Sequence, residues 1–276
     1  MLFVWIRSLA LDTPIIRCYV TYEIRYVMSQ SGMTLSPAIR RRAQTMSLLK
    51  NLIVFAMIAV AVPIGARADD AAYPIKADDG SLVANHKVTA ALENQIEKLP
   101  GVIVAGNPRG KVTLAEFYDL NCPYCRKASA DIAELVRANP NLRLVLVPFP
   151  VLGIPSIQGS RVELAVARLV SAPKFYEFHR ALYAGRGMID GNRAFAAAKA
   201  IGLDIDKVGK MADEDAIGQV MIAHVRLGNA LGIAATPGLV IKGVAILGYP
   251  GKNALQKIIQ SVQRCDKVVC GGAGVN

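Results

Sequence analysis

The stretch Val112-Thr-Leu-Ala-Glu-Phe-Tyr-Asp-Leu-Asn-Cys-Pro-Tyr-Cys125 decides the fold of this chain. Residues 112–118 are mostly apolar, as is typical of a buried strand, and a helical pattern begins at the cysteines. Cys122 therefore falls at a helix N-terminus, where unpaired N–H groups and the helix dipole favour negative charge. This setting lowers the pKa of a thiol and makes its thiolate a nucleophile. Cys125 lies one turn further, where it can resolve a mixed disulfide.

A pair of cysteines separated by two residues also has other uses, namely half of a zinc site or a structural disulfide. A zinc site would need further ligands, and the three histidines are scattered along the chain. Cys265 and Cys270 complete a four-cysteine set in principle. We interpret Cys122 and Cys125 as a redox-active pair because they follow a strand and begin a helix.

An export signal precedes this region. Residues 46–50 are a short basic segment, residues 52–64 are an apolar run, and Ala66-Arg-Ala68 is a cleavage motif, so residues 46–68 read as a signal peptide. We expect cleavage after Ala68 and a periplasmic protein. The apolar run is short for a transmembrane helix, although an uncleaved anchor is the alternative. We interpret residues 1–45 as a non-native N-terminal extension, because they would make the basic segment far too long.

Charge argues against one class of function. The 276 residues include 32 Lys and Arg and 21 Asp and Glu, for a net charge of +11. The basic residues are dispersed and are not interleaved with aromatic residues, so nucleic-acid binding receives no support. The part after residue 68 holds four cysteines, an even number that suits disulfide chemistry in an exported chain.

Residues 69–100 are expected to form a leader with a short amphipathic helix. Asn85 is its predicted N-cap, and apolar residues recur from Val88 to Leu99 at helical spacing. Such a helix has to bury its apolar stripe. It docks either onto its own domain or onto another subunit.

Residues 101–276 are expected to form one α/β domain in two halves. The first is a β-α-β unit with a parallel, right-handed crossover. The second is a β-hairpin about Lys242-Gly243 followed by a helix. A helical insertion of about residues 158–231 separates them. The predicted elements are strands at 102–104, 112–118, 142–147, 238–241 and 244–247, and helices at 123–138, 158–171, 173–184, 192–201, 213–231 and 254–264.

Four segments, in this order, resemble DsbA-like thiol:disulfide oxidoreductases of the thioredoxin superfamily. They are Gly106-Asn-Pro-Arg-Gly-Lys111, Glu116 to Cys125, Phe149-Pro-Val-Leu-Gly153 and Gly232-Ile-Ala-Ala-Thr-Pro-Gly238. The resemblance spans about residues 101–262 and is nearest to the exported branch that includes the suppressor-of-copper-sensitivity C proteins. It implies a thioredoxin fold with a helical insertion, and dithiol–disulfide exchange in the periplasm.

The resemblance also implies roles for single residues. Cys122 corresponds to the nucleophile, Cys125 to the resolving thiol, and Pro237 to a cis-proline that faces the cysteine pair. A cis bond before proline exposes the backbone of Thr236 for pairing with an extended substrate, whereas a trans turn proline is the alternative. Glu116 matches a buried acid that assists proton transfer, or else it is a strand residue in a salt bridge.

Three residues are expected to contact substrate: Pro123, Tyr124 and Thr236. The family's strong oxidants carry histidine where this chain has Tyr124. Histidine stabilises a thiolate as a cation and tyrosine does not, so a less oxidising pair is expected. The pKa of Cys122 should then lie between about 3.5 and about 8.5.

Cys265 and Cys270 lie at the end of the last helix and in a Gly-rich tail. We expect a structural disulfide, because the segment lacks the proline and the helix start that accompany Cys122. A second redox pair is the alternative.

The predicted function is that of an exported thiol:disulfide oxidoreductase. It exchanges disulfides with cysteines of other exported proteins through a mixed disulfide at Cys122, and it needs no metal or organic cofactor. A redox partner has to reset the pair. The alternatives are a disulfide isomerase or reductase kept reduced by its partner, and a non-catalytic copper-handling protein that uses both thiols as soft ligands.

Overall fold

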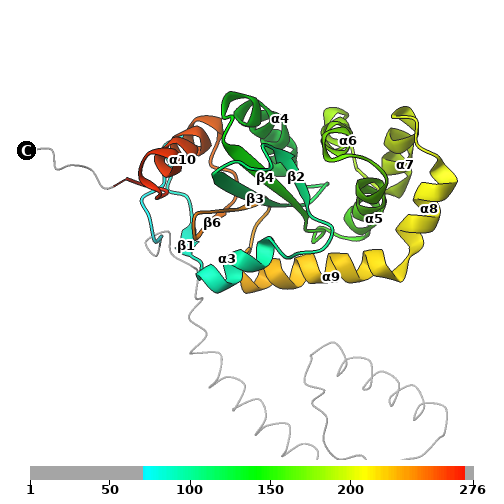
Figure 1. Cartoon of the computed structure of the whole chain (residues 1–276), viewed down its shortest axis with the longest axis horizontal. Helices are drawn as coiled ribbons and strands as arrows, with labels where there is room; N and C mark the ends of the chain where they lie inside the picture. The colour runs from blue at the N-terminus through cyan, green and yellow to red at the C-terminus, as the bar shows by residue number, and fades with distance from the viewer. Residues whose placement is uncertain (1–70, 271–276) are drawn as a thin grey trace, which may run out of the picture. The chain divides into compact units, whose positions relative to one another are not determined.

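The computed structural model describes residues 71–270 (Figure 1). The expected extension 1–45, the signal peptide 46–68 and its cleavage site after Ala68 lie outside the described residues. Within residues 71–270, no helix is both long enough and apolar enough to cross a membrane.

One six-stranded sheet forms the centre of the domain, in the order β1-β6-β5-β3-β4-β2. The central strands β3 and β4 pair in parallel, and every other neighbouring pair is antiparallel. The α/β class and the thioredoxin fold are confirmed. The strands are β1 (Asn85–Lys87), β2 (Ile103–Gly106), β3 (Val112–Tyr118), β4 (Leu142–Pro148), β5 (Gly238–Ile241) and β6 (Val244–Leu247).

Helix α4 (Pro123–Ala138) connects β3 to β4, as the β-α-β pattern predicts. Five helices separate β4 from β5, and α10 (Lys252–Cys265) closes the described chain. The five are α5 (Ile154–Leu169), α6 (Ala172–Ala184), α7 (Gly191–Ala200), α8 (Ile205–Asp213) and α9 (Asp215–Ala230).

The prediction of four helices in the insertion was wrong, because it missed α8. The missing signal was Asp204, whose carboxylate accepts hydrogen bonds from the N–H groups of Asp206 and Lys207 and caps the helix. The insertion also begins at Ile154, four residues before the expected boundary. Pro155 lies in the first turn of α5, where its missing N–H costs nothing.

Helices cover both faces of the sheet (Figure 1). The alternation along β3 sends Leu114 and Tyr118 into one core cluster and Phe117 into the other. The first cluster also contains buried residues of α4, α10 and the insertion. The second contains buried residues of α3 (Ala90–Ile96) and α9. Glu116 shares its side of β3 with Tyr118, toward α4 and the insertion.

The expectation that Asn85 caps a helix was wrong. Asn85 begins β1, and its buried side chain bonds the backbone of Tyr73 and Val83. Thr89 caps α3 instead, and its hydroxyl accepts from the N–H of Leu92. Ile96 of α3 is buried against the domain's own sheet. The leader is thus integrated into the domain because its polar and apolar groups both find partners there.

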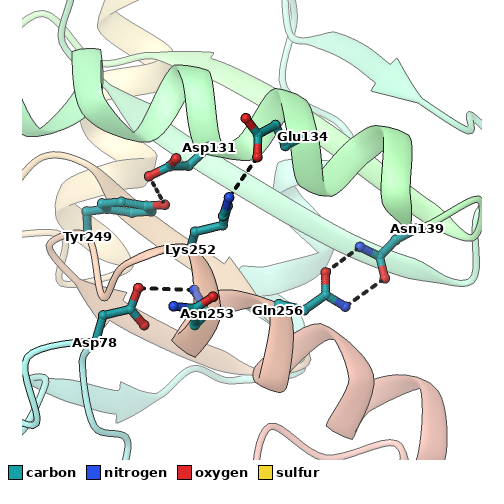
Figure 2. Close-up of polar contacts among 8 residues, drawn as sticks. All are labelled: Asp78, Asp131, Glu134, Asn139, Tyr249, Lys252, Asn253 and Gln256. Carbon is teal, nitrogen blue, oxygen red and sulfur yellow. Dashed lines mark hydrogen bonds and ion pairs between the residues drawn. The ribbon is translucent and has the colours of Figure 1, made fainter.

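Side-chain contacts hold α10 against α4 and the leader (Figure 2). Gly251 precedes α10 and has no side chain to cap it. Asp78 of the leader supplies this cap, since its carboxylate accepts from Asn253 N–H at 3.1 Å and Ala254 N–H at 2.7 Å. Three further pairs join α10 and the loop before it to α4: Tyr249–Asp131, Lys252–Glu134 and Gln256–Asn139.

Candidate active site

Cys122 and Cys125 lie at the beginning of α4, both as free thiols. Cys122 is the N-cap of α4, and its thiol makes no side-chain cap hydrogen bond. Pro123 follows in the first turn. Cys122 retains 5% of its surface and Cys125 retains none. A reagent from solvent therefore meets the Cys122 sulfur first.

Asp119 holds the loop that carries the cysteines, a role that the sequence interpretation missed. Its buried carboxylate accepts hydrogen bonds from the N–H groups of Asn121, Val151 and Leu152 and from the hydroxyl of Ser156. The loop after β3 is thereby fixed to the loop after β4. The available signal was an acidic residue directly after a buried strand and just before the cysteine pair.

The Thr236–Pro237 peptide bond is cis. β5 begins directly after Pro237 and pairs with β3, with Gly238 opposite Phe117. This register places the Thr236 carbonyl beside the cysteine pair, 3.1 Å from the Cys122 sulfur, which donates to it when Cys122 is protonated. Two of the expected site segments, 114 residues apart in sequence, therefore meet at one sulfur atom.

The surroundings of the two thiols give them opposite acidities. The pKa of Cys122 is lowered to about 5, mainly because the Cys125 thiol donates a hydrogen bond to its sulfur, and the Thr236 side chain and the backbone N–H groups of Cys125 and Tyr124 also stabilise the thiolate. That value lies inside the expected range. Burial, followed by the same hydrogen bond, raises the pKa of Cys125 far above that of a free thiol. At neutral pH the pair therefore holds one thiolate, on Cys122, and one thiol.

Glu116 is buried on β3, with 2% of its surface exposed. Burial raises the pKa of this carboxyl to about 8, and negative charge on Cys122 and on Glu163 adds to the effect. Glu116 in turn raises the pKa of Cys125. Among residues 71–270, Glu116 forms no salt bridge, and a pKa of about 8 means that its carboxyl group holds its proton at neutral pH.

Exposed apolar residues lie next to Cys122 in sequence and on the loop after β4. Tyr124, between the two cysteines, is 64% exposed, and Pro123 is exposed as well. Val151 and Leu152 are exposed on the loop that Asp119 holds. Thr236 is half-buried. The three residues expected to contact substrate therefore all lie at the protein surface or close to it, next to the nucleophile.

Cys265 and Cys270 are joined by a disulfide at the end of α10. Ser261 of α10 contacts both sulfurs and also accepts from the Cys270 N–H. In residues 71–270, no three His, Cys, Asp or Glu side chains are grouped so that they could hold a metal ion.

The comparisons with known proteins agree with this geometry. A family model described as thioredoxin matches residues 98–261. The chain belongs to this thioredoxin family.

Among solved structures, a thioredoxin-like oxidoreductase from Silicibacter pomeroyi DSS-3 is 32% identical, with a TM-score of 0.57 over 63% of this chain and 96% of its own. The thiol-disulfide exchange protein alpha-DsbA2 from Wolbachia pipientis is 24% identical, with a TM-score of 0.57 over 62% of this chain and 94% of its own. The catalytic domain of Proteus mirabilis ScsC is also 24% identical, with a TM-score of 0.55 over 62% and 96%. The fold is thus the one that the resemblance to DsbA-like proteins and their ScsC branch predicted.

A curated relative has a different overall length. The Na(+)/H(+) antiporter NhaA 1 from Salinispora arenicola (strain CNS-205) is 28% identical over 160 residues. The match covers 57% of this chain and 24% of that protein. The chain thus spans about a quarter of the length of the curated relative that it matches.

Proposed function

We propose that the protein is an exported thiol:disulfide oxidoreductase that exchanges disulfides with the cysteines of other exported proteins. The observation that carries the proposal is the difference in acidity and burial between Cys122 and Cys125. Cys122 is acidic, capable of attack and nearest to solvent, while Cys125 is buried and keeps its proton. A structural disulfide has no use for such a difference, whereas exchange through a mixed disulfide requires it.

The reaction balances with the groups of the site. In the oxidised protein, a substrate thiolate attacks the Cys122 sulfur, the bond to Cys125 breaks, and Cys125 leaves with the electron pair and takes a proton. A second substrate thiolate then attacks the substrate sulfur of the mixed disulfide, and Cys122 leaves as a thiolate. The substrate dithiol loses two electrons and becomes a disulfide, and the pair gains them.

Glu116 is the proton donor for Cys125 in this scheme. A thiolate of very high pKa is a poor leaving group, so a proton supplied as the bond breaks lowers the barrier. Glu116 is close enough to raise the pKa of Cys125, and its own high pKa means that it still carries a proton at neutral pH. It regains that proton from solvent after the exchange.

Substrate binds in extended form across the Cys122 sulfur. Thr236, Pro123 and Tyr124 contact it, with the backbone of Thr236 pairing to the peptide as an added strand would. Pro237 keeps the Thr236 carbonyl turned toward Cys122. Two partners follow from this function: cysteine-containing exported proteins as substrates, and a redox protein that resets the pair.

The direction of exchange follows from the acidity of Cys122. A stabilised thiolate stabilises the reduced pair, so the oxidised pair accepts electrons readily. The pKa of about 5 therefore favours net oxidation of substrates over reduction. The sequence pattern at residues 46–68, interpreted as a signal peptide, supports export to the periplasm, where disulfides form and persist.

A turnover assay tests the proposal. The oxidised protein, at one hundredth of the concentration of a reduced, unfolded test protein, should oxidise it when a chemical oxidant regenerates the pair. Cys122→Ser should abolish turnover, and a variant with both Cys265→Ala and Cys270→Ala should keep it. Stoichiometric consumption without turnover would instead identify a thiol-binding protein, and activity in Cys122→Ser would overturn the assignment.

A further inference from the structure

Buried polar groups without partners gather at one place in the described part of the chain. Two buried hydroxyl groups there, Ser160 Oγ and Tyr176 Oη, have no hydrogen-bond partner, and the buried hydroxyl of Tyr118 interacts with the carboxyl group of Glu163. They come from β3, α5 and α6, on the side of the sheet that Glu116 faces. Folded proteins pair nearly all their buried polar groups, so this grouping calls for a functional explanation.

Glu163 and His179 form a buried pair at the centre of the group. His179 Nδ1 lies 2.7 Å from Glu163 Oε1, and their side chains are 2% and 0% exposed. A carboxylate oxygen only accepts, so Nδ1 is the donor. The imidazole ring meets Tyr118 edge-on at 4.8 Å and Tyr183 at 5.2 Å between ring centroids. A buried charge of this kind is costly and changes the protonation of its neighbours.

The pair reaches the candidate active site through β3 and α6. Glu116 and Tyr118 lie two residues apart on the same face of β3, and Tyr118 contacts His179. Tyr183 of α6 donates to the carbonyl of Asp119, in the loop that leads to the cysteines. The pair and Glu116 therefore share one water-poor region, in which negative charge on Glu163 disfavours the ionisation of Glu116.

Glu116 has apolar neighbours in the sheet, and the titratable groups that interact with it come mainly from the helices. Its partners in register on β4 and β5 are Leu146 and Leu239, which are apolar. The charged and titratable groups that interact with it or with its neighbours include Tyr118 of β3, Asp119 and Cys122 in the loop before α4, Cys125, Asp131 and Arg137 of α4, Glu163 of α5, Tyr176, His179, Arg180 and Tyr183 of α6, and Tyr249 before α10.

We propose that Glu163 and His179 are positioning residues that keep Glu116 protonated at neutral pH, so that Glu116 has a proton to give to Cys125. The last clause rests on the proposed function. The pair acts through charge: Glu163 brings a carboxylate into the region of Glu116, and His179 holds it there by a hydrogen bond.

The pKa of Glu116 supports this assignment. Three causes raise it, namely burial, negative charge on Cys122 and negative charge on Glu163. In the oxidised protein Cys122 carries no charge, so burial and Glu163 remain. Removing the Glu163 charge should then lower the pKa of Glu116, so that Glu116 loses its proton at a lower pH.

The test is a titration of Glu116 in the oxidised, full-length protein labelled with ¹³C-glutamate, in which Glu116→Gln identifies the resonance. Glu163→Gln should lower the pKa of Glu116 by about one unit. Glu177→Gln, which removes an exposed carboxylate on α6, should leave it unchanged. An unchanged pKa of Glu116 in Glu163→Gln would overturn the proposal.

His179→Gln provides a second test in case Glu163→Gln does not fold. Glutamine still donates to Glu163 and cannot carry positive charge, so the pKa of Glu116 should stay at or above the wild-type value, and a fall would overturn the proposal. The titration needs no turnover, so it can be interpreted whether or not the protein exchanges disulfides. If the shift appears and wild type has no exchange activity, the proposed function fails and the charge coupling stands.

Discussion

Replacing Glu116 with glutamine should make the stability of the reduced protein rise with pH between about pH 5 and 8, where that of wild type changes little. The pKa of this carboxyl is about 8 in the folded protein, above the value of about 4.3 expected when unfolded. Between these values the folded state binds one more proton than the unfolded state. Stability therefore falls with rising pH, by about 1.4 kcal/mol per pH unit, and the loss is about 4 kcal/mol at pH 7.

The Cys122 thiolate has the opposite effect on the pH dependence of stability. Its pKa is about 5 in the folded protein and about 8.5 when unfolded, so the unfolded state binds the extra proton in this window. The thiolate therefore adds about 1.4 kcal/mol of stability per pH unit as pH rises from about 5 to about 8.5. Between pH 5 and 8 the two effects nearly cancel in reduced wild type. In reduced Glu116→Gln only the rising effect of Cys122 remains.

Urea unfolding of the reduced proteins at pH 5, 6, 7 and 8 measures the difference. The free energy of unfolding of Glu116→Gln relative to wild type should increase by about 1.4 kcal/mol per pH unit. A constant offset between the two proteins is irrelevant, since only the slope reports the titration. Glu177→Gln, which changes an exposed carboxylate on α6, should run parallel to wild type. Parallel curves for Glu116→Gln and wild type would refute a buried, proton-holding Glu116.

Three further predictions concern the pair and the leader. Tyr124→His should lower the pKa of Cys122, which is measured from thiolate absorbance against pH. It should also raise the reduction potential of the pair by about 30 mV for each 1.4 kcal/mol of added thiolate stabilisation. Coincident titration curves for this variant and wild type would show that the residue between the cysteines does not set the potential. Cys125→Ala should accumulate mixed disulfides when its Cys122 thiolate attacks disulfide-bonded substrate proteins, as seen on non-reducing gels, and accumulation in Cys122→Ala would assign the nucleophile to Cys125 instead. Asp78→Ala should cost about 1 kcal/mol in urea unfolding because it removes the cap of α10, whereas Asp79→Ala at an exposed neighbouring position should cost less, and equal costs would count against the cap.

Local patterns were sufficient for the central half of this fold. The apolar run before Cys122, the proline in the first turn of α4 and the strand after Pro140 predicted a β-α-β unit, because each signal lies within a few residues of the element it specifies. The hairpin about Lys242-Gly243 was found for the same reason. Both of its turn residues have positive φ, 47° and 70°, as a tight hairpin turn requires.

Distant contacts decided the rest. Asn85 has the side chain of a helix cap, yet pairing with β6 and bonds to Tyr73 draw it into a strand. Asp78 caps a helix more than 170 residues further along the chain, for which no local pattern exists.

The chemistry of the site divides in the same way. The spacing of Cys122 and Cys125 identified the pair and its position on a helix, because both depend on neighbouring residues. The acidity of Cys122 depends on Cys125 and on Thr236, the acidity of Cys125 depends mainly on burial, and the protonation of Glu116 depends on burial first and then on charge at Cys122 and Glu163. Charge and solvent exclusion act through space, so only the tertiary structure decides which groups share a water-poor region and which of them keeps the proton.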